Sequence, residues 1–459
     1  MVFTAQHIYG LVITLLIVTV VGLGAARKVR TAADFAVGGR RSGVTLVAGT
    51  IIGTMIGGAS TVGTAQLAFT VGLSAWWFTL GAGLALLALA LFYARPLRVT
   101  GLETIPQFLV VSYGPAAGPL TSLASSAGIF FSLVANILAA VPLITAIFAL
   151  DPAQAAGFVF LLVIVYVFFG GVWGTGLVGV VKTLLILIML AAVGWVTWRE
   201  MGGIGGYTAA FPAFPWFSLF GRGFWVDAGS GLSLIVGTLS TQTYIQAVYA
   251  ARDAETARRG AVVAALITLP TGLPAVMVGM FMRLHHPDIA PIEALPLFIL
   301  QYLPPWLGGV AIGALLLAAV GSAAGLALGV GTMLTCDICG KWSAASGPRV
   351  GLWLNRAIVL AVTAAAALFS FGNLRSLVLE WNFLSMGLRG AGIFLPLTAA
   401  VFWPGRINKT TAVWSMAAGA GVALVWKMLF PQGLDPLYAG LVASAALLAA
   451  GWQRSNKKD

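Results

Sequence analysis

The chain has 459 residues, of which 60% are hydrophobic and only 8% are charged. Soluble domains carry about 25% charged residues, so the composition excludes soluble enzymes and binding domains and predicts an all-α polytopic membrane protein. The net charge of +12 does not indicate nucleic-acid binding, because Lys and Arg occur in short groups between apolar stretches and do not gather on one face of a soluble domain.

Apolar stretches of membrane-spanning length follow one another along almost the whole chain. A helix that crosses a bilayer needs about 20 largely apolar residues. Thirteen stretches meet this requirement, and they cover residues 7–26, 44–71, 75–97, 119–147, 155–175, 177–198, 224–249, 260–283, 306–334, 351–371, 378–402, 412–430 and 435–452. The connections between them are too short for a separate domain, so we expect residues 1–459 to form a single membrane domain with about 13 transmembrane helices.

Basic residues are distributed unevenly between the loops on the two sides of the predicted membrane. Eighteen of the 25 Lys and Arg residues fall in one set of loops and four in the alternate set, while Lys182, Arg389 and Lys427 fall inside apolar stretches. Lys and Arg favour cytoplasmic loops. We therefore expect a multi-pass protein of the cytoplasmic (plasma) membrane, with its N-terminus outside and its C-terminus in the cytoplasm.

Small and polar residues interrupt two of the apolar stretches near their middle. Residues 53–61 read GTMIGGAST, and residues 237–242 read GTLSTQ. Glycines and hydroxyls at this depth favour a broken helix, and a break exposes half-helix ends that bind ions and polar solutes. The alternative is that the small residues only allow neighbouring helices to pack closely.

The two interrupted stretches begin predicted spans that stand five apart. Since five is odd, a five-span unit that is repeated once reappears upside down in the membrane. We therefore expect an extra N-terminal span and cytoplasmic loop, a first repeat, an outer loop that acts as a partial lid, a second repeat and two C-terminal spans, at residues 1–43, 44–198, 199–223, 224–402 and 403–459. Inverted repeats with interrupted first helices are typical of secondary transporters with a site near the midplane.

Five segments resemble motifs of the sodium/solute symporter family, in the family's order and at its spacing. They are residues 34–40 (DFAVGGR), 170–183, 246–260, 318–338 and 396–409. The resemblance runs from about residue 30 to about residue 430. It implies the leucine-transporter-like five-plus-five fold, thirteen helices with an outside N-terminus, and sodium-coupled symport of a small solute.

The resemblance also implies a sodium site between the second and the ninth span. It assigns backbone carbonyl ligands to Gly53, Ile56 and Ala319 and a hydroxyl ligand to Ser322. Sodium is a hard cation that prefers several oxygen ligands, as the hard divalent cations do. The matching positions therefore form a candidate metal site for Na⁺.

Three positions depart from the family pattern near this site. Ala323 stands where the family has a second hydroxyl, Gly179 stands where it has a carboxylate, and Lys182 replaces the glutamine of the same motif. A lysine inside a membrane span is costly and usually functional. Its ammonium could replace the sodium ion, as a basic side chain does in some sodium-independent transporters of this architecture, or carry a coupling proton. Alternatively, it could extend to the cytoplasmic surface.

Arg389 is the second charged residue at membrane depth, near the middle of the stretch 378–402. Its guanidinium could bind a substrate carboxylate through two parallel hydrogen bonds, or it could form a structural ion pair with Glu380 or Asp227. The further candidates for substrate contact are polar residues of the interrupted and neighbouring spans, namely Ser60, Thr61, Asn136, Thr241 and Gln242.

The remaining function classes fit the sequence less well. The 13 acidic residues and three His are spread mostly over loops without an acid, base or metal cluster, so we expect no enzyme and no organic cofactor. We expect secondary active transport by alternating access, with a small and carboxylate-bearing solute, a coupling cation (Na⁺ or H⁺) and the lipid bilayer as partners and no nucleic acid. Proton-coupled or sodium-independent transport through Lys182 is the alternative, and a transporter-like sensor or a membrane enzyme is the remote one.

Overall fold

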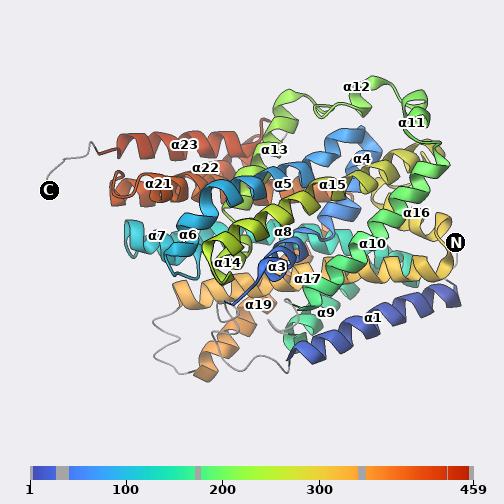
Figure 1. The fold of residues 1–459 in the computed structure, drawn as a ribbon, viewed down its shortest axis with the longest axis horizontal. Helices are drawn as coiled ribbons and strands as arrows, with labels where there is room; N and C mark the ends of the chain where they lie inside the picture. Colours follow the sequence, from blue (N-terminus) through green and yellow to red (C-terminus); the bar gives the residue numbers. More distant parts are fainter. Residues whose placement is uncertain (1–3, 27–40, 171–176, 340–347, 432, 454–459) are drawn as a thin grey trace.

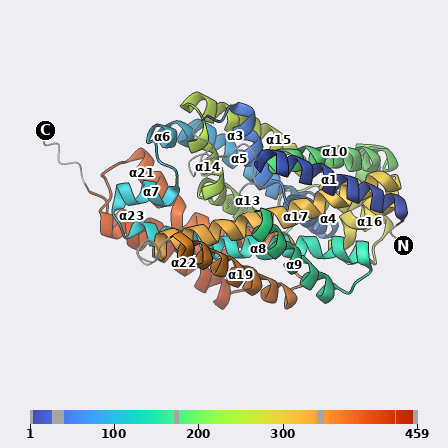
Figure 2. The same ribbon diagram turned by 90° about the horizontal axis from the view of Figure 1, so that it is seen from below.

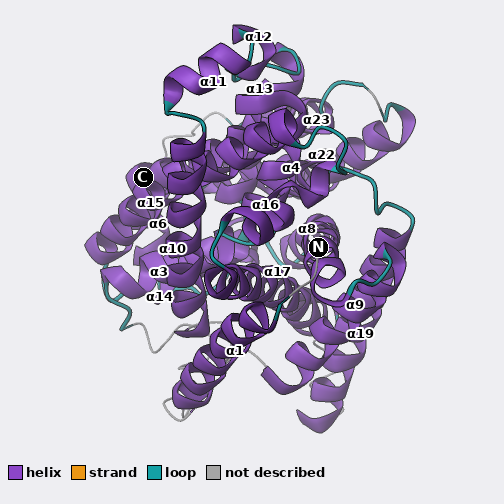
Figure 3. Ribbon diagram, turned by 90° about the vertical axis from the view of Figure 1, so that its right-hand side faces the viewer, coloured by secondary structure: helices purple, strands orange, loops and turns teal. Residues whose placement is uncertain are grey.

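The computed structural model describes residues 4–26, 41–170, 177–339, 348–431 and 433–453. The described residues form helices, turns and loops and contain no β-strand (Figure 3). The motif segment 34–40 and part of the segment 170–183 lie outside the described residues. Within the described part, the predicted all-α fold is confirmed.

Each predicted span coincides with one helix or with two consecutive helices. In chain order they are α1 (Ala5–Ala26), α3 with α4 (Val44–Met55, Thr64–Val71), α5 with α6 (Trp77–Ala88, Ala94–Val99), α8 (Ala117–Phe148), α9 (Pro152–Gly170), α10 (Leu177–Glu200), α13 with α14 (Phe224–Leu239, Gln242–Ala250), α15 (Ala254–His285), α17 (Pro305–Met333), α19 (Pro348–Phe371), α20 with α21 (Val378–Arg389, Leu395–Phe402), α22 (Lys409–Leu429) and α23 (Pro436–Ala450). Among the described residues, eight helical segments are long and apolar enough to cross a membrane, and five shorter apolar helices accompany them. The total of thirteen crossings stays a prediction.

Short helices that the sequence analysis did not predict occur in the connections. They are α7 (Ile105–Tyr113), α11 (Ile204–Ala210), α12 (Ala213–Trp216) and α16 (Ala294–Tyr302). α11 and α16 lie at the end of the bundle that holds the N-terminus, whereas α6 and α7 lie at the end that holds the C-terminus (Figure 1). The connections therefore alternate between the two ends, as the distribution of basic residues requires.

Both interrupted helices break where the sequence predicts it. α3 ends at Met55, and Ile56 is extended with φ −85° and ψ 101°. α13 ends at Leu239, and Thr241 has φ −96° and ψ 119° before α14 begins. Backbone hydrogen bonds from and to Ser42 join the start of α3 to the end of α14. These bonds place the start of one interrupted helix beside the end of the other, as expected for an inverted repeat.

The segment between α10 and α13 folds over the end of α4 and the short helix η3 (Gly72–Trp76). The indole nitrogen of Trp77 donates to the carbonyl oxygen of Leu219 at 2.7 Å. Gly72 has φ +67°, and a Cβ atom at this position would collide with the carbonyl oxygen of Trp216. Glycine is therefore required here for two reasons, the left-handed backbone and the close approach of the segment.

Burial separates the inner helices from the outer ones. α8 and α17 run side by side through the bundle (Figure 2). In its most apolar window α8 is 83% buried, whereas α22 is only 28% buried. α1 and α22 expose large apolar side chains such as Leu16 and Met428. Lipid is the environment in which such surfaces are stable, so polar residues on α8 face protein and not lipid.

Candidate functional site

A small cavity lies at the level of the two helix breaks. Its volume is about 30 Å³, and it is lined by Thr54, Met55, Gly57, Ala59, Phe78, Ser132, Asn136, Thr241, Thr243, Tyr244, Ser322, Leu326, Asn382, Met386 and Arg389. These residues come from both interrupted helices and from α5, α8, α17 and α20. One water needs about 10–15 Å³ of such space, so the cavity admits a few waters and must widen to hold an organic solute.

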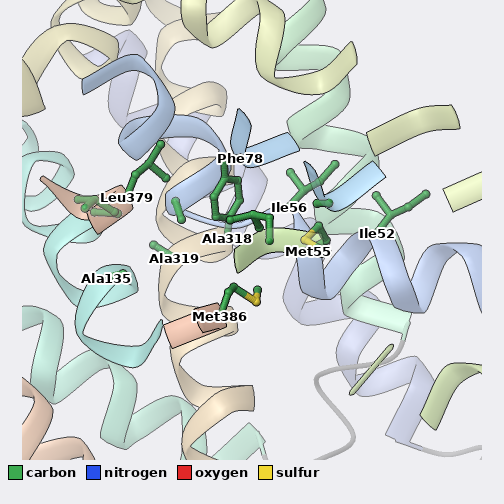
Figure 4. Close-up of a cluster of buried hydrophobic side chains, with 14 of the residues drawn as sticks. Ile52, Met55, Ile56, Phe78, Ala135, Ala318, Ala319, Leu379 and Met386 are labelled. Carbon is green, nitrogen blue, oxygen red and sulfur yellow. The ribbon is translucent and has the colours of Figure 1, made fainter. Parts of the chain in front are cut away.

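One wall of the cavity is apolar. Met55, at the end of α3, lies near Phe78 of α5 and Met386 of α20 (Figure 4). The aromatic ring of Phe78 packs against that of Phe383 with 6.3 Å between centroids. Apolar walls with a few placed polar groups are typical of small-molecule sites.

The first break uses its own hydroxyls to satisfy the backbone that it frees. The hydroxyls of Ser60 and Thr61 donate to the carbonyl oxygen of Gly57 at 3.0 and 2.9 Å. The amide of Gly58 donates to the side-chain oxygen of Asn136 at 3.3 Å. Of the three predicted substrate contacts in this region, the structure places Asn136 at the cavity and not Ser60 or Thr61.

At the second break, Thr241 and Gln242 point to different places. The Thr241 hydroxyl donates to the carbonyl oxygen of Gly237 at 2.6 Å and lies at the cavity. The Gln242 side chain accepts from the amide of Ile105 at 2.8 Å and donates to the carbonyl of Glu103 at 3.3 Å. Gln242 therefore attaches α14 to the start of α7 and is not among the residues that line the cavity.

Arg389 is the charged residue that lines the cavity, and it is 1% exposed. Its guanidinium donates to the hydroxyls of Thr241, Ser385 and Ser132 at 2.9, 2.8 and 3.1 Å and to the backbone carbonyl of Ser385 at 3.2 Å. A Cβ atom on Gly128 would lie 2.6 Å from the Arg389 Cγ. Gly128 thus leaves the space that the arginine stem occupies.

The two acidic residues considered as partners of Arg389 lie elsewhere. Asp227 is completely buried but pairs with Arg222 at 2.7 Å. Glu380 is exposed on the first turn of α20. Among the described residues, no carboxylate pairs with Arg389. Hydroxyl dipoles hold the guanidinium, and the part of the chain that the structure describes supplies no counterion for its positive charge.

Ser132 and Asn382 line the cavity and were missed by the sequence analysis, although a signal for them exists. Ser132 and Asn136 are four residues apart on α8, and Asn382, Ser385 and Arg389 recur at intervals of three and four on α20. Residues at this spacing lie on one helix face. Polar residues that share a face inside an otherwise apolar span point to a common site.

Lys182 reaches inward and not toward the membrane surface. Its side chain is 6% exposed, and its ammonium donates to the hydroxyl of Ser322 on α17 at 3.1 Å. The alternative of a lysine that extends to the cytoplasmic surface is therefore wrong for this structure. Among the described residues, no acidic side chain pairs with Lys182.

Ser322, the partner of Lys182, belongs to the predicted sodium site, and the other residues of that site lie near the end of α3. A Cβ atom on Gly53 would lie 3.1 Å from the carbonyl oxygen of Gly179, and one on Gly57 would lie 3.0 Å from the Ser322 hydroxyl. A Cβ atom on Gly58 would lie 3.2 Å from that of Ala319. α10 therefore packs against both α3 and α17, and α17 reaches the break that follows α3 at Gly57 and Gly58.

A sequence model of the sodium:solute symporter family matches residues 35–419. The chain belongs to the sodium:solute symporter family. This membership confirms the predicted family and identifies the protein as a multi-pass membrane transporter and not an enzyme.

Curated relatives of this symporter family member share part of the chain. The high-affinity choline transporter 1 of Drosophila melanogaster is 25% identical over 277 residues, which are 59% of this chain and 45% of the relative. The sodium/mannose cotransporter SLC5A10 of Bos taurus is 24% identical over 246 residues, 45% of this chain and 39% of the relative. The matches thus span less than half the length of these relatives.

Solved structures share the fold of this symporter family member over nearly the whole chain. A Na⁺-coupled sialic acid symporter, in a substrate-bound and outward-open state, has a TM-score of 0.78 with 19% identity and covers 98% of this chain and 97% of that chain. Mhp1, a nucleobase-cation-symport-1 family transporter, was solved in a closed conformation with bromovinylhydantoin bound. It has a TM-score of 0.58 with 15% identity and covers 90% of this chain and 92% of that chain.

Proposed function

We propose that the protein is a secondary active transporter that carries a small carboxylate-bearing solute across the cytoplasmic membrane by alternating access. The observation that carries this proposal is the buried guanidinium of Arg389, which lines the cavity and has no acidic partner among the described residues. A carboxylate in the cavity supplies the missing negative charge and accepts two parallel hydrogen bonds from the guanidinium. The relatives are named for different solutes, so their names do not indicate the solute of this protein. The proposed class of solute is therefore inferred from Arg389.

The other contacts of the solute follow from the lining of the cavity. We assign polar contacts to Asn136 and Thr241, which the sequence singles out, and to Ser132 and Asn382, which share helix faces with Asn136 and Arg389. The apolar wall around Phe78 would contact the remainder of the solute. Ser60, Thr61 and Gln242 do not contact the solute directly in this proposal. The hydroxyls of Ser60 and Thr61 hold the first break in position, and the side chain of Gln242 holds α14.

Alternating access requires the cavity to open to each side in turn. We propose that the first repeat (44–198) and the second repeat (224–402) rock against each other about the two breaks, with the N-terminus outside. On the side of the 199–223 segment, Phe383 lies between Phe78 and the guanidinium of Arg222, which is 5.7 Å from the Phe383 ring. Asp227 holds Arg222 in place. Entry from the outside then requires Phe78 and Phe383 to separate.

Coupling requires that the solute and a cation favour the same conformation. Family membership makes sodium the first cation to test, with Gly53, Ile56, Ala319 and Ser322 as the matching ligand positions. These residues lie around the end of α3, and Lys182 donates a hydrogen bond to one of them, Ser322.

The proposal is tested by uptake into proteoliposomes and by ligand-induced thermal stabilisation of the purified protein. The probes are acetate, lactate, pyruvate and sialic acid, each compared with its neutral amide or methyl ester. We expect at least one carboxylate to stabilise the protein and its neutral analogue to fail. Loss of a charged bidentate contact costs about 2–5 kcal/mol, so Arg389→Gln should weaken binding by about 30-fold or more.

The matched control is Arg375→Gln, because Arg375 is exposed on a loop next to α20. This variant should bind and transport as the unmodified protein does. Neutral analogues that stabilise the protein as well as their acids, or an Arg389→Gln variant that is folded and keeps full affinity, would contradict the proposal.

A further inference from the structure

A positive charge that belongs to the protein stands at the end of the first half-helix. The ammonium of Lys182 on α10 donates to the Ser322 hydroxyl on α17 at 3.1 Å, and the lysine side chain is 6% exposed. The same hydroxyl lies close to Gly57, just after the end of α3, where a Cβ atom would be 3.0 Å from it. Three helices that are distant in sequence thus bring one ammonium to this point.

The end of α3 is a place that attracts a cation. The last carbonyl groups of a helix have no intrahelical partners, and the macrodipole places a partial negative charge there. In transporters with interrupted helices, such ends and the unwound carbonyls coordinate the coupling cation. Near the end of α3, Gly53 lies against α10, the helix that carries Lys182, and Gly57, just after the break, lies against Ser322 of α17.

The side chains present fit an ammonium better than a sodium ion. Ala323 and Gly179 offer no side-chain oxygen, and the Ser322 hydroxyl already accepts a hydrogen bond from Lys182. A sodium ion at this place would lie near a like charge in an environment of low dielectric, where repulsion is strong. Among the described residues, no acidic side chain neutralises either charge.

We propose that the ammonium of Lys182 occupies the place of the coupling sodium ion, so that this family member holds its first half-helix without bound sodium. The proposal deepens the proposed function, since it concerns the cation that the transport cycle uses. Lys182 is a positioning residue in this scheme: it joins α10 to α17 through Ser322, next to the break that follows α3, whereas Arg389 contacts the solute.

Sodium binding is measured without any solute, by thermal unfolding of the purified full chain in NaCl against matched choline chloride. A ligand that binds only the folded state raises stability in a saturable manner. We expect no saturable, sodium-specific rise in Tm for the unmodified protein. The same result is expected for Lys427→Gln, a control that removes a half-buried lysine near the end of α22, whose ammonium donates to the carbonyl oxygen of Pro431.

The converse experiment restores the missing oxygens. The variant Gly179→Asp/Lys182→Gln/Ala323→Ser should gain a saturable rise in Tm that is specific for sodium. Because changes in the groups around a metal typically alter affinity about 10- to 100-fold, the apparent Kd for sodium should fall by about tenfold or more relative to the unmodified protein. Lys182→Arg, which keeps the charge, should stay insensitive to sodium.

Two results would overturn the proposal. One is a saturable sodium-specific rise in Tm of the unmodified protein, and this result decides whether or not any variant folds. The other is a folded triple variant that remains insensitive to sodium. Neither depends on the carboxylate assays, so a failure of the proposed solute class and a failure of the proposed cation are separate results.

Discussion

Arg389 combines complete burial with hydrogen bonds that come from hydroxyls and a backbone carbonyl. The effective penalty for burying one ion is several kcal/mol, and a hydrogen bond to a charged group contributes about 1.5–3 kcal/mol. The partners of Arg389 therefore offset much of its desolvation without cancelling its charge. An anion that enters the cavity meets a guanidinium that is already oriented.

The arginine also depends on a glycine that faces it from α8. A methyl group on Gly128 would lie 2.6 Å from the Arg389 Cγ and 2.8 Å from the Ser385 carbonyl oxygen. Overpacking of this kind costs about 1–3 kcal/mol. We expect Gly128→Ala to lower Tm and to weaken carboxylate binding, because the guanidinium must move away from its hydroxyl partners.

Gly421→Ala is the matched control for this prediction. Gly421 lies inside α22, and a methyl group added there would have no atom within 4 Å. Alanine stabilises a helix interior by up to about 1 kcal/mol relative to glycine. This variant should leave carboxylate binding unchanged and leave Tm equal or higher. Equal behaviour of the two variants would show that Gly128 does not position Arg389.

The sequence predicted the chemistry of the site better than the direction of individual side chains. Arg389, Asn136, Thr241 and Ser322 line the cavity because a polar group inside an apolar span needs a protein partner or a solute. Gln242 has the same chemistry, but backbone groups near α7 bind its side chain instead. Hydroxyls beside a helix break can satisfy the freed backbone, and sequence spacing does not reveal which ones do so.

At the scale of elements, the two helix breaks were predictable and the short connecting helices were not. Clusters of Gly, Ser and Thr in the middle of a span weaken a continuous helix, because glycine is flexible and the hydroxyls compete for backbone hydrogen bonds. The position of such a cluster therefore predicts where the helix breaks. α7, α11 and α16 contain nine residues or fewer. Helices of that length are marginal without tertiary packing, so the sequence does not distinguish them from loops.

The contact between η3 and the 199–223 segment can be tested by comparing two glycine variants. Gly72→Ala must adopt φ +67° with a Cβ atom and must also displace the Trp216 backbone. Gly114→Ala must also adopt a positive φ, of +93°, but it displaces no neighbour, because no atom lies within 4 Å of the added methyl group. A left-handed conformation costs an L-residue about 1–2 kcal/mol.

We expect Gly72→Ala to lower Tm more than Gly114→Ala does. Hydrogen exchange should increase in residues 204–220 for Gly72→Ala alone, because only this variant separates the segment from α4. Equal exchange in both variants would mean that backbone strain, and not the displaced contact, explains the loss of stability.

For the whole molecule, the charges around the cavity are unbalanced. Arg389 lines it, Lys182 adjoins it through Ser322, and no described acidic residue pairs with either of them. The net charge of +12 did not reveal this excess of positive charge at the cavity, because most of the Lys and Arg residues lie in loops. It became evident only when the fold brought α10, α17 and α20 around one cavity.

A tethered ammonium has a consequence for the energetics of the cycle, because it cannot leave with the solute. A carrier that binds sodium and a monocarboxylate together moves no net charge. A carrier whose cation is a lysine moves one negative charge each time a monocarboxylate crosses. The membrane potential then acts on the solute itself, at about 2.3 kcal/mol per 100 mV.

Proteoliposomes with an imposed potassium diffusion potential would reveal this electrogenic movement. We expect an interior-positive potential of about 100 mV to raise the accumulation of a transported monocarboxylate by up to about 50-fold, since 1.4 kcal/mol corresponds to tenfold. An interior-negative potential should drive release. Accumulation that ignores the potential but follows a sodium gradient would instead indicate that a mobile cation travels with the solute. With a negative interior, as in a living cell, the fixed lysine would make this protein better suited to export or exchange of organic acids than to their uptake.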